Sequence, residues 1–427
     1  MTSPVFVEHS AALPLVTISI GFLTGSAADP PGKEGLARVA ARMLRRGADG
    51  LTNEQIEDLV DRLGGELGIE AGPSSVSLSS EVISRNLEPF VGLVEKLLAS
   101  STLPEEEVGR VVREMQAEIV DSRDSDRSLA SRALRRTLFA GHPYARRVSG
   151  SIDSLETITR ADVVRWIETH LTRKNAVVAF SGDIDEARAR EIAERILARL
   201  PEGRAFVDET PEPAGVRGRH LVLVDKPDRT QVQLVVGSLG STPHDPDHVP
   251  WSVGNTAFGG TFTSRLMQEV RAKRGWSYGA SSRIGYDRRR DAFTMWTAPS
   301  STDAAACLAL ELGLVSEVKE GGLTEEEVGF VKNYLVRSHA FDVDTARKRV
   351  ALPLEEALLG LPAGYHAGWL DRVRACQRAE INEALARRMP REDLVVAAVV
   401  TRADTGEALE KAMGDVASVT VLEPDFE

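Results

Sequence analysis

Alternation of apolar and polar residues marks two predicted strands near the start of the chain. Residues 16–22 (VTISIGF) and 75–82 (SVSLSSEV) alternate with a period of two, which is typical of a half-buried strand. Residues 35–46 and 52–63 instead carry apolar residues at helical spacing, and a glycine follows the first of these helices. Strands and helices interleaved in this way favour an α+β fold in which adjacent strands pair largely antiparallel.

The second half of the chain repeats the pattern of the first. LPEEEVGRV at 103–111 matches LTEEEVGFV at 323–331. NAVVAFSGD at 175–183 matches DLVVAAVVT at 393–401, at nearly the same offset along the chain. Matches that recur in the same order at nearly one spacing indicate an internal duplication.

A proline- and glycine-rich stretch separates the two halves. Residues 201–219 (PEGRAFVDETPEPAGVRGR) contain three prolines and three glycines, which predicts an extended linker. The sequence therefore predicts two homologous domains, 1–200 and 220–427, of about 200 residues each. Each is expected to be a largely antiparallel sheet packed with helices.

Composition narrows the classes of partner and compartment. The chain of 427 residues is 42% hydrophobic and 27% charged, with a net charge of −12, which disfavours nucleic acid or an anionic membrane as a partner. Cys307 and Cys376 have no metal-type spacing and are expected to be buried as small apolar residues. No stretch approaches the roughly 18 apolar residues that span a membrane. No signal peptide is recognisable at the N-terminus either, so we expect a cytoplasmic protein.

The stretch GNTAFGGTFTSRLMQEVRAKRGWSYG, residues 254–279, carries the candidate chemistry. The glycines Gly259 and Gly260 allow sharp turns and close backbone approach, and a predicted helix follows them. Arg271 and Tyr278 stand seven residues apart, at the helix end and at the next strand start. A guanidinium and a phenol supply hydrogen-bond donors but no nucleophile, which suits binding of a peptide carbonyl or oxyanion. On their own, an Arg and a Tyr beside a turn also fit a purely structural role.

The stretch HDPDH offers a second pair of histidines. His244 and His248 lie four residues apart with acidic residues between them, but the surrounding prolines predict a loop or helix entry instead of a ligand pair. The pair Gly259–Gly260 lacks the Lys and Ser/Thr of a phosphate-binding loop, so nucleotide binding is not expected.

Over essentially its whole length the chain resembles the two-domain pitrilysin-type (M16) zinc peptidases. The resemblance rests on the duplication and on four motifs: GLA…RG at 35–47, LGGEL at 63–67, GHPY at 141–144 and GG-x3-SRL at 259–266. It implies the M16 α+β fold. In active members, a helix carries HxxEH, whose histidines bind zinc and whose Glu is the general base, and a later Glu completes the site.

This chain departs from the M16 pattern at the zinc motif. Both histidine positions are arginines, Arg38 and Arg42, and the position of the general base is Ala41. A guanidinium has no lone pair to donate to a metal ion. Glu118 stands at the position of the distal zinc ligand, where pairing with Arg38 or Arg42 is the alternative role. The resemblance thus implies a degenerate zinc site that binds no metal.

The resemblance also implies a role for the second half. In M16 peptidases the C-terminal domain contributes an Arg and a Tyr, seven residues apart, to the zinc site, and Arg271 and Tyr278 match that pair. Some bacterial members divide the work between one chain with HxxEH and another with the Arg/Tyr pair. This chain would then be the non-zinc subunit of a heterodimeric metallopeptidase, inactive alone, with zinc in a homologous partner and a peptide as substrate. The alternative is an inert scaffold similar to the respiratory-complex core proteins.

Overall fold

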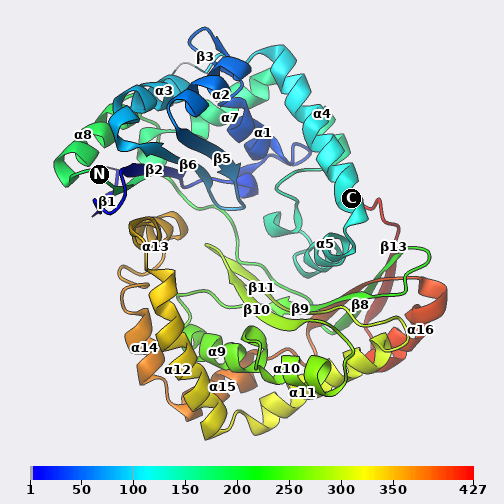
Figure 1. Ribbon diagram of the computed structural model, residues 1–427. Coiled ribbons are helices and arrows are strands. Elements are labelled where there is room, and N and C mark those ends of the chain that lie inside the picture. Colours follow the sequence, from blue (N-terminus) through cyan, green and yellow to red (C-terminus); the bar gives the residue numbers. More distant parts are fainter. Residues whose placement is uncertain (1–2, 100) are drawn as a thin grey trace. The chain divides into compact units, whose positions relative to one another are not determined.

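The computed structural model describes residues 3–99 and 101–427 and divides into two compact units (Figure 1). Unit 1 contains the residues up to Ile119, Arg146–Thr210 and Ala340–His366. Unit 2 contains Val120–Ala145, Pro211–His339 and Ala367–Glu427. Each unit is a sheet packed with helices, so the predicted α+β class is confirmed.

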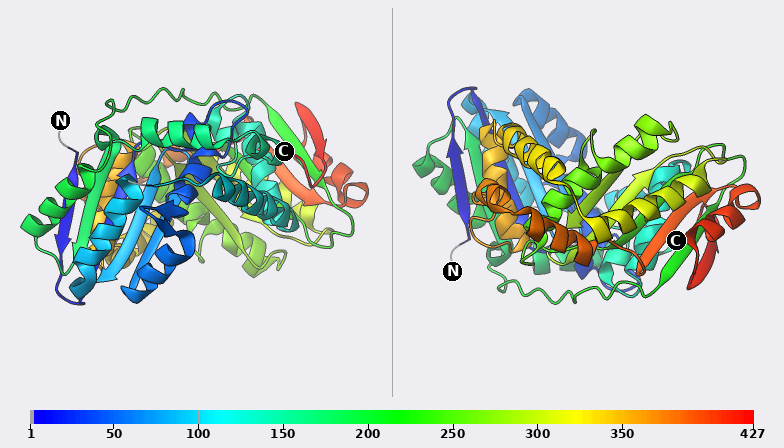
Figure 2. Two further views of the ribbon diagram at one scale, coloured as in Figure 1. Left: turned by 90° about the horizontal axis from the view of Figure 1, so that it is seen from above. Right: turned by 90° about the horizontal axis from the view of Figure 1, so that it is seen from below.

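Unit 1 is built on a five-stranded sheet in the order β1-β7-β2-β6-β5, with β1 and β5 as its two edge strands (Figure 2). Strands β1 and β7 pair parallel and all other neighbours pair antiparallel, so the sheet is mixed. In β2 the side chains of Val16, Ile18 and Ile20 are fully buried, as the alternating pattern requires. The strands are β1 (Val5–His9), β2 (Leu15–Phe22), β5 (Gly65–Ala71), β6 (Val76–Ile83) and β7 (Ala176–Gly182). A small hairpin adds β3 (Gly47–Ala48) and β4 (Leu51–Thr52).

Helix α1 is the element of unit 1 that carries the degenerate zinc motif. Gly35 precedes it in the left-handed region, at φ 99°. The buried carboxylate of Asp29 accepts hydrogen bonds from the backbone N–H groups of Gly35 and Ala37, both at 2.9 Å. Burial raises the pKa of Asp29 to about 7, against the effect of these two hydrogen bonds. The unit 1 helices are α1 (Leu36–Met43), α2 (Asn53–Arg62), α3 (Leu87–Ala99), α4 (Glu105–Asp121), α6 (Ile152–Glu156), α7 (Arg160–His170), α8 (Glu186–Leu197) and α13 (Ala346–Leu359), with α4 counted up to Ile119.

Unit 2 is built on a six-stranded sheet in the order β10-β11-β9-β12-β8-β13. Strand β8 pairs parallel with β12 and with β13, whereas the other neighbours pair antiparallel, so this sheet is mixed as well. Its strands are β8 (Arg219–Asp225), β9 (Gln233–Leu239), β10 (Ala280–Tyr286), β11 (Arg290–Thr297), β12 (Leu394–Val400) and β13 (Ser418–Leu422). Its helices are α5 (Asp126–Leu138), α9 (His248–Asn255), α10 (Arg265–Met267), α11 (Ala304–Gly321), α12 (Glu325–Asp342), α14 (Trp369–Ala375), α15 (Arg378–Arg388) and α16 (Arg402–Met413), with α12 counted up to His339.

The duplicated halves exchange one helix each. Helix α5 begins at Asp126 and α13 at Ala346, the same offset that separates the repeated motifs, so the two helices occupy equivalent places in the repeat. Helix α5 packs on β9 and β12 in unit 2, whereas α13 packs on β7 and β1 in unit 1. The compact units are therefore not contiguous in sequence, and the domain limits 1–200 and 220–427 stay a prediction.

The stretch between the repeats has no regular structure from residue 201 to residue 216, and most of its residues are exposed. Among the described residues, no helix combines the length and the apolar character that crossing a membrane requires.

Candidate functional site

In unit 1, three of the four residues at the degenerate zinc motif come together. Arg38 and Arg42 lie one turn apart on α1, and Glu118 faces them from α4. The Glu118 carboxylate accepts from Arg38 Nη2 at 3.2 Å and from Arg42 Nη2 at 2.8 Å. Ala41 does not join them, because it is fully buried on the core side of α1.

This arrangement does not fit a metal ion. A zinc site needs several ligands with free lone pairs, but two of the three groups present are guanidinium cations. The one carboxylate is already occupied by both cations, which leave the cluster with a net charge of +1. Within residues 3–99 and 101–427, no group of three or more His, Cys, Asp or Glu side chains could hold a metal ion. The described contacts make this cluster a salt bridge between α1 and α4.

In unit 2, the backbone around the glycine pair is wound unusually. A π-helical segment, Thr256–Gly260, precedes the short α10, and a second one, Gln268–Lys273, follows it. π-Helical turns are rare and recur at functional sites. A side chain at Gly259 is sterically excluded, because a Cβ atom there would lie 2.3 Å from the Ser282 Oγ atom of β10. At Gly260 the nearest atom would be 3.4 Å away, so only the first glycine is required by a close approach.

The structure brings Arg271 and Tyr278 together. The Cζ atom of Arg271 lies 4.9 Å from the centre of the Tyr278 ring and 4.3 Å from the centre of the Phe262 ring. Both distances are within the range of cation–π contacts. Arg271 is partly buried, whereas 87% of Tyr278 and 65% of Phe262 are exposed. Neither ring therefore contributes to the core of unit 2.

The turn that carries Tyr278 is anchored by a buried serine. Ser277 Oγ donates to the Gly279 carbonyl at 2.6 Å and accepts from the backbone N–H of Ala298 at 3.0 Å. On the other side, the backbone N–H of Gly275 donates to the Arg271 carbonyl at 3.0 Å, which closes an α-turn at the end of the π-helical segment. These bonds fix the backbone on both sides of Tyr278, while its side chain remains in solvent.

The basic side chains near Arg271 are neutralised. Arg265 forms a two-pronged ion pair with Glu327, at 2.8 and 2.9 Å. Lys273 and Arg274 both bind Glu269, and hydrogen bonds from these two cations lower the pKa of that carboxyl. Within the described parts of the chain, no carboxylate lies within ion-pair distance of Arg271.

Comparison with known proteins identifies the family to which this chain belongs. The model described as "Insulinase (Peptidase family M16)" matches residues 5–151, and the one described as "Peptidase M16 inactive domain" matches residues 157–335. The chain belongs to peptidase family M16. The predicted resemblance to this family, including its two-domain fold, is confirmed.

Relatives of this M16 chain carry both peptidase and non-peptidase names. The non-peptidase homolog YmxG of Helicobacter pylori is 22% identical over 398 residues, which cover 93% of this chain and 91% of the relative. An uncharacterized zinc protease of Rickettsia bellii is 25% identical over 344 residues, covering 80% of this chain and 81% of the relative. A solved structure from Pseudomonas fluorescens, described as a peptidase M16 inactive domain, is 25% identical with a TM-score of 0.87 and covers 93% of this chain and 96% of that one.

The HDPDH stretch serves the packing of α9 and α15. His248 is buried and its Nδ1 atom lies 2.6 Å from Ser241 Oγ, and burial lowers the pKa of this histidine to about 4. Asp247 accepts hydrogen bonds from Arg387 at 2.7 Å and from Arg388 at 2.6 Å. The residues named in this network of contacts all belong to unit 2.

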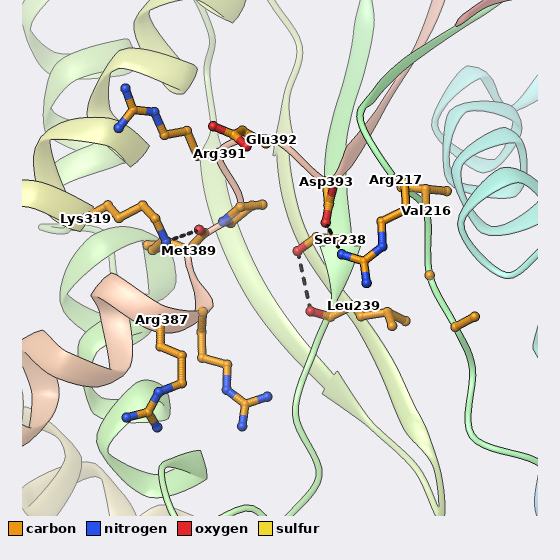
Figure 3. Close-up of a pocket in the computed structure, with 14 residues that line it drawn as sticks. Val216, Arg217, Ser238, Leu239, Lys319, Arg387, Met389, Arg391, Glu392 and Asp393 are labelled. Atoms are coloured by element: carbon orange, nitrogen blue, oxygen red, sulfur yellow. Dashed lines mark hydrogen bonds and ion pairs between the residues drawn. The ribbon is translucent and has the colours of Figure 1, made fainter. Parts of the chain in front are cut away.

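A pocket of about 540 Å³ lies beside this network (Figure 3). Its basic lining residues are already engaged. Lys319 donates to the carbonyl oxygens of Ala386 and Met389, and Arg391 pairs with Glu320 at 2.8 Å. Burial lowers the pKa of Lys319. The pocket therefore presents few free charges to an anionic ligand.

Two residues of interest were not singled out by the sequence. Phe262 is a lone aromatic residue in the polar turn between the glycine pair and SRL. An aromatic residue isolated among polar ones was the feature of the sequence that could have drawn attention to it. Glu311 is a fully buried carboxyl on α11, a helix whose sequence reads as ordinary core. Nothing in the spacing around Glu311 indicated its burial.

Proposed function

We propose that this chain is the non-zinc subunit of a heterodimeric M16 metallopeptidase. Its Arg271 and Tyr278 would bind the peptide substrate at the zinc site of a homologous partner that carries HxxEH. The observation that supports this function is the state of Arg271, a cation without a carboxylate partner among the described residues, beside an exposed phenol.

The chemistry of the pair fits this role. The guanidinium has five N–H donors and the phenol has one O–H donor, so both can donate to a peptide carbonyl or to the oxyanion that develops from it. Neither group is a nucleophile, and Arg38 and Arg42 stand where zinc ligands would be needed. The chain alone is therefore expected to hydrolyse no peptide.

The test first identifies the HxxEH-bearing homologue that co-purifies with this chain. The two chains are then co-expressed, and the peptidase activity of the purified heterodimer is measured. Arg271→Ala should lower peptide hydrolysis by roughly a hundred- to a thousand-fold, the usual cost of losing one oxyanion donor. Tyr278→Phe removes one hydroxyl and should lower kcat more than it raises KM. Lys273→Ala is the matched control, since it removes an exposed cation of the same turn whose partner Glu269 keeps Arg274.

A scaffold without a catalytic role is the second candidate. The name of the Helicobacter pylori relative, a non-peptidase homolog, favours it. A heterodimer that keeps full activity with both Arg271 and Tyr278 replaced would support the scaffold and refute the first proposal.

A further inference from the structure

The loop after the glycine pair holds an aromatic residue in an unfavourable place. Phe262 lies between Gly260 and α10, in a turn closed by a hydrogen bond from the Ser264 N–H to the Thr261 carbonyl at 3.1 Å. It exposes 65% of its surface to solvent. An exposed phenylalanine gains little from burial, so packing alone does not explain why the ring is held there.

The ring of Phe262 contacts Arg271 and no other cation among the described residues. Its centre lies 4.3 Å from the Cζ atom of Arg271, closer than the ring of Tyr278 at 4.9 Å. Arg271 therefore has aromatic rings as neighbours. Arg265, on the preceding helix α10, instead pairs with the carboxylate of Glu327.

The two kinds of neighbour differ in what they leave available. A carboxylate binds a guanidinium in its plane and takes up its N–H donors, as Glu327 does with two hydrogen bonds from Arg265 Nη2. An aromatic ring attracts the cation through the quadrupole of its face and accepts no strong hydrogen bond. A ring can therefore restrict a long, flexible side chain and still leave its donors free for a ligand.

We infer that Phe262 is a positioning residue for Arg271. Its ring holds the guanidinium beside Tyr278, where no described residue accepts a hydrogen bond from it, so its donors can bind the carbonyl or carboxylate oxygen of a ligand. The effect of Phe262 on catalysis rests on the proposed function. The contact between Phe262 and Arg271 does not, because both residues lie in this chain.

The contact is tested first in the isolated chain by NMR of the arginine Nε–Hε groups. The Arg271 signal is identified by its loss in Arg271→Lys. Protons above an aromatic face are shielded, so Phe262→Leu, which keeps the apolar bulk but removes the ring, should move this signal downfield. Phe262→Tyr should leave it nearly in place, as should Phe330→Leu, which removes an exposed ring of α12 elsewhere in unit 2. A signal that Phe262→Leu does not move overturns the inference.

The consequence is tested in the heterodimer by a double-mutant cycle. Phe262→Leu should lower kcat about two- to five-fold, the size expected for one exposed cation–π contact, and Phe262→Tyr should restore it. If Phe262 acts through Arg271, the same change should have no further effect in the Arg271→Ala background. The positioning role is refuted if Phe262→Leu lowers kcat equally in the parent and in the Arg271→Ala background. It is also refuted if Phe262→Leu lowers kcat in neither background while Arg271→Ala alone has its full effect. Both outcomes leave the proposed function standing.

A failure of the proposed function can be told apart from a failure of this inference. If Arg271→Ala leaves heterodimer activity unchanged, the proposed function is wrong, and the NMR shift alone then decides whether Phe262 holds Arg271.

Discussion

Glu311 predicts an unusual pH dependence of the stability of unit 2. Its side chain is fully buried in the core between α11 and the end of β11. Its Oε1 atom lies 4.0 Å from Cys307 Sγ, and its Oε2 atom has no hydrogen-bond partner among the described residues. Burial raises the pKa of this carboxyl from 4.5 to about 8, with the Thr297 hydroxyl opposing the rise. The folded protein therefore keeps a proton that the unfolded chain releases.

The sign and size of the effect follow from proton linkage. Below pH 4.5 the carboxyl is neutral in both states, and it makes no pH-dependent contribution. Between pH 4.5 and about 8 the unfolded chain binds fewer protons, so the free energy of unfolding falls as the pH rises. One pH unit corresponds to about 1.4 kcal/mol, so the loss approaches roughly 5 kcal/mol before it levels off near pH 8. This figure is an upper limit, since local relaxation or water entry reduces it.

Glu311→Gln removes the titration and nearly preserves the shape. Because Oε2 has no partner among the described residues, an amide there would leave two buried N–H donors unpaired, one more than the protonated carboxyl, at a cost of about 1–3 kcal/mol that does not depend on pH. The variant should therefore unfold more easily than the parent at pH 5 and resist unfolding better at pH 8.5. Urea titrations at both pH values, followed by tryptophan fluorescence, measure the difference. Four of the five tryptophans, Trp251, Trp276, Trp296 and Trp369, report on unit 2.

A matched variant separates burial from charge. Glu317→Gln removes one negative charge from an exposed position on the same helix and should change the unfolding midpoint little at either pH. If the stability difference between Glu311→Gln and the parent is the same at pH 5 and pH 8.5, Glu311 is ionised in the folded state and the reasoning fails.

Two further predictions concern the metal and the chain between the repeats. Metal analysis of chelator-free protein should find no zinc held one per chain at Arg38 and Arg42, because these side chains offer no lone pair; a tightly held zinc lost on Glu118→Ala would contradict this. Limited proteolysis should cut first within residues 201–219 and give two fragments of about 200 residues. Because α5 and α13 each pack in the unit of the other repeat, the nicked fragments should elute together in native gel filtration; early cuts inside both repeats would speak against a linker.

The sequence predicted local structure well wherever periodicity was strong. The strand predicted at 16–22 is β2, and its buried positions follow the alternation. The exchange of α5 and α13 could not be predicted, because the apolar face of a helix shows that it is covered but not by which sheet. Leu358 of α13, for example, packs against Gly21 of β2, which belongs to the other repeat. The parallel pairing of β1 with β7 could not be predicted either, because these strands come from opposite ends of the first repeat.

The candidate site was partly visible in the sequence. The spacing of Arg271 and Tyr278 suggested that they meet, and in the structure they do. Phe262 escaped notice because the sequence does not indicate its contact with Arg271, which lies in a π-helical segment, residues 268–273, that no periodicity of 2 or 3.6 predicts.

The arginines of the two repeats show how residue type alone underdetermines function. Arg38 and Arg42 share the carboxylate of Glu118, so their charge and some of their donors are taken up in joining two helices of unit 1. Arg271 carries the same group, but its described neighbours are aromatic rings, and no residue in the described ranges accepts a hydrogen bond from its guanidinium. A buried or paired guanidinium contributes to the fold, whereas one that is held but unpaired can bind a ligand. This criterion supports the proposal that an oxygen ligand binds at Arg271 and Tyr278, whereas the described contacts of the α1–α4 cluster join two helices.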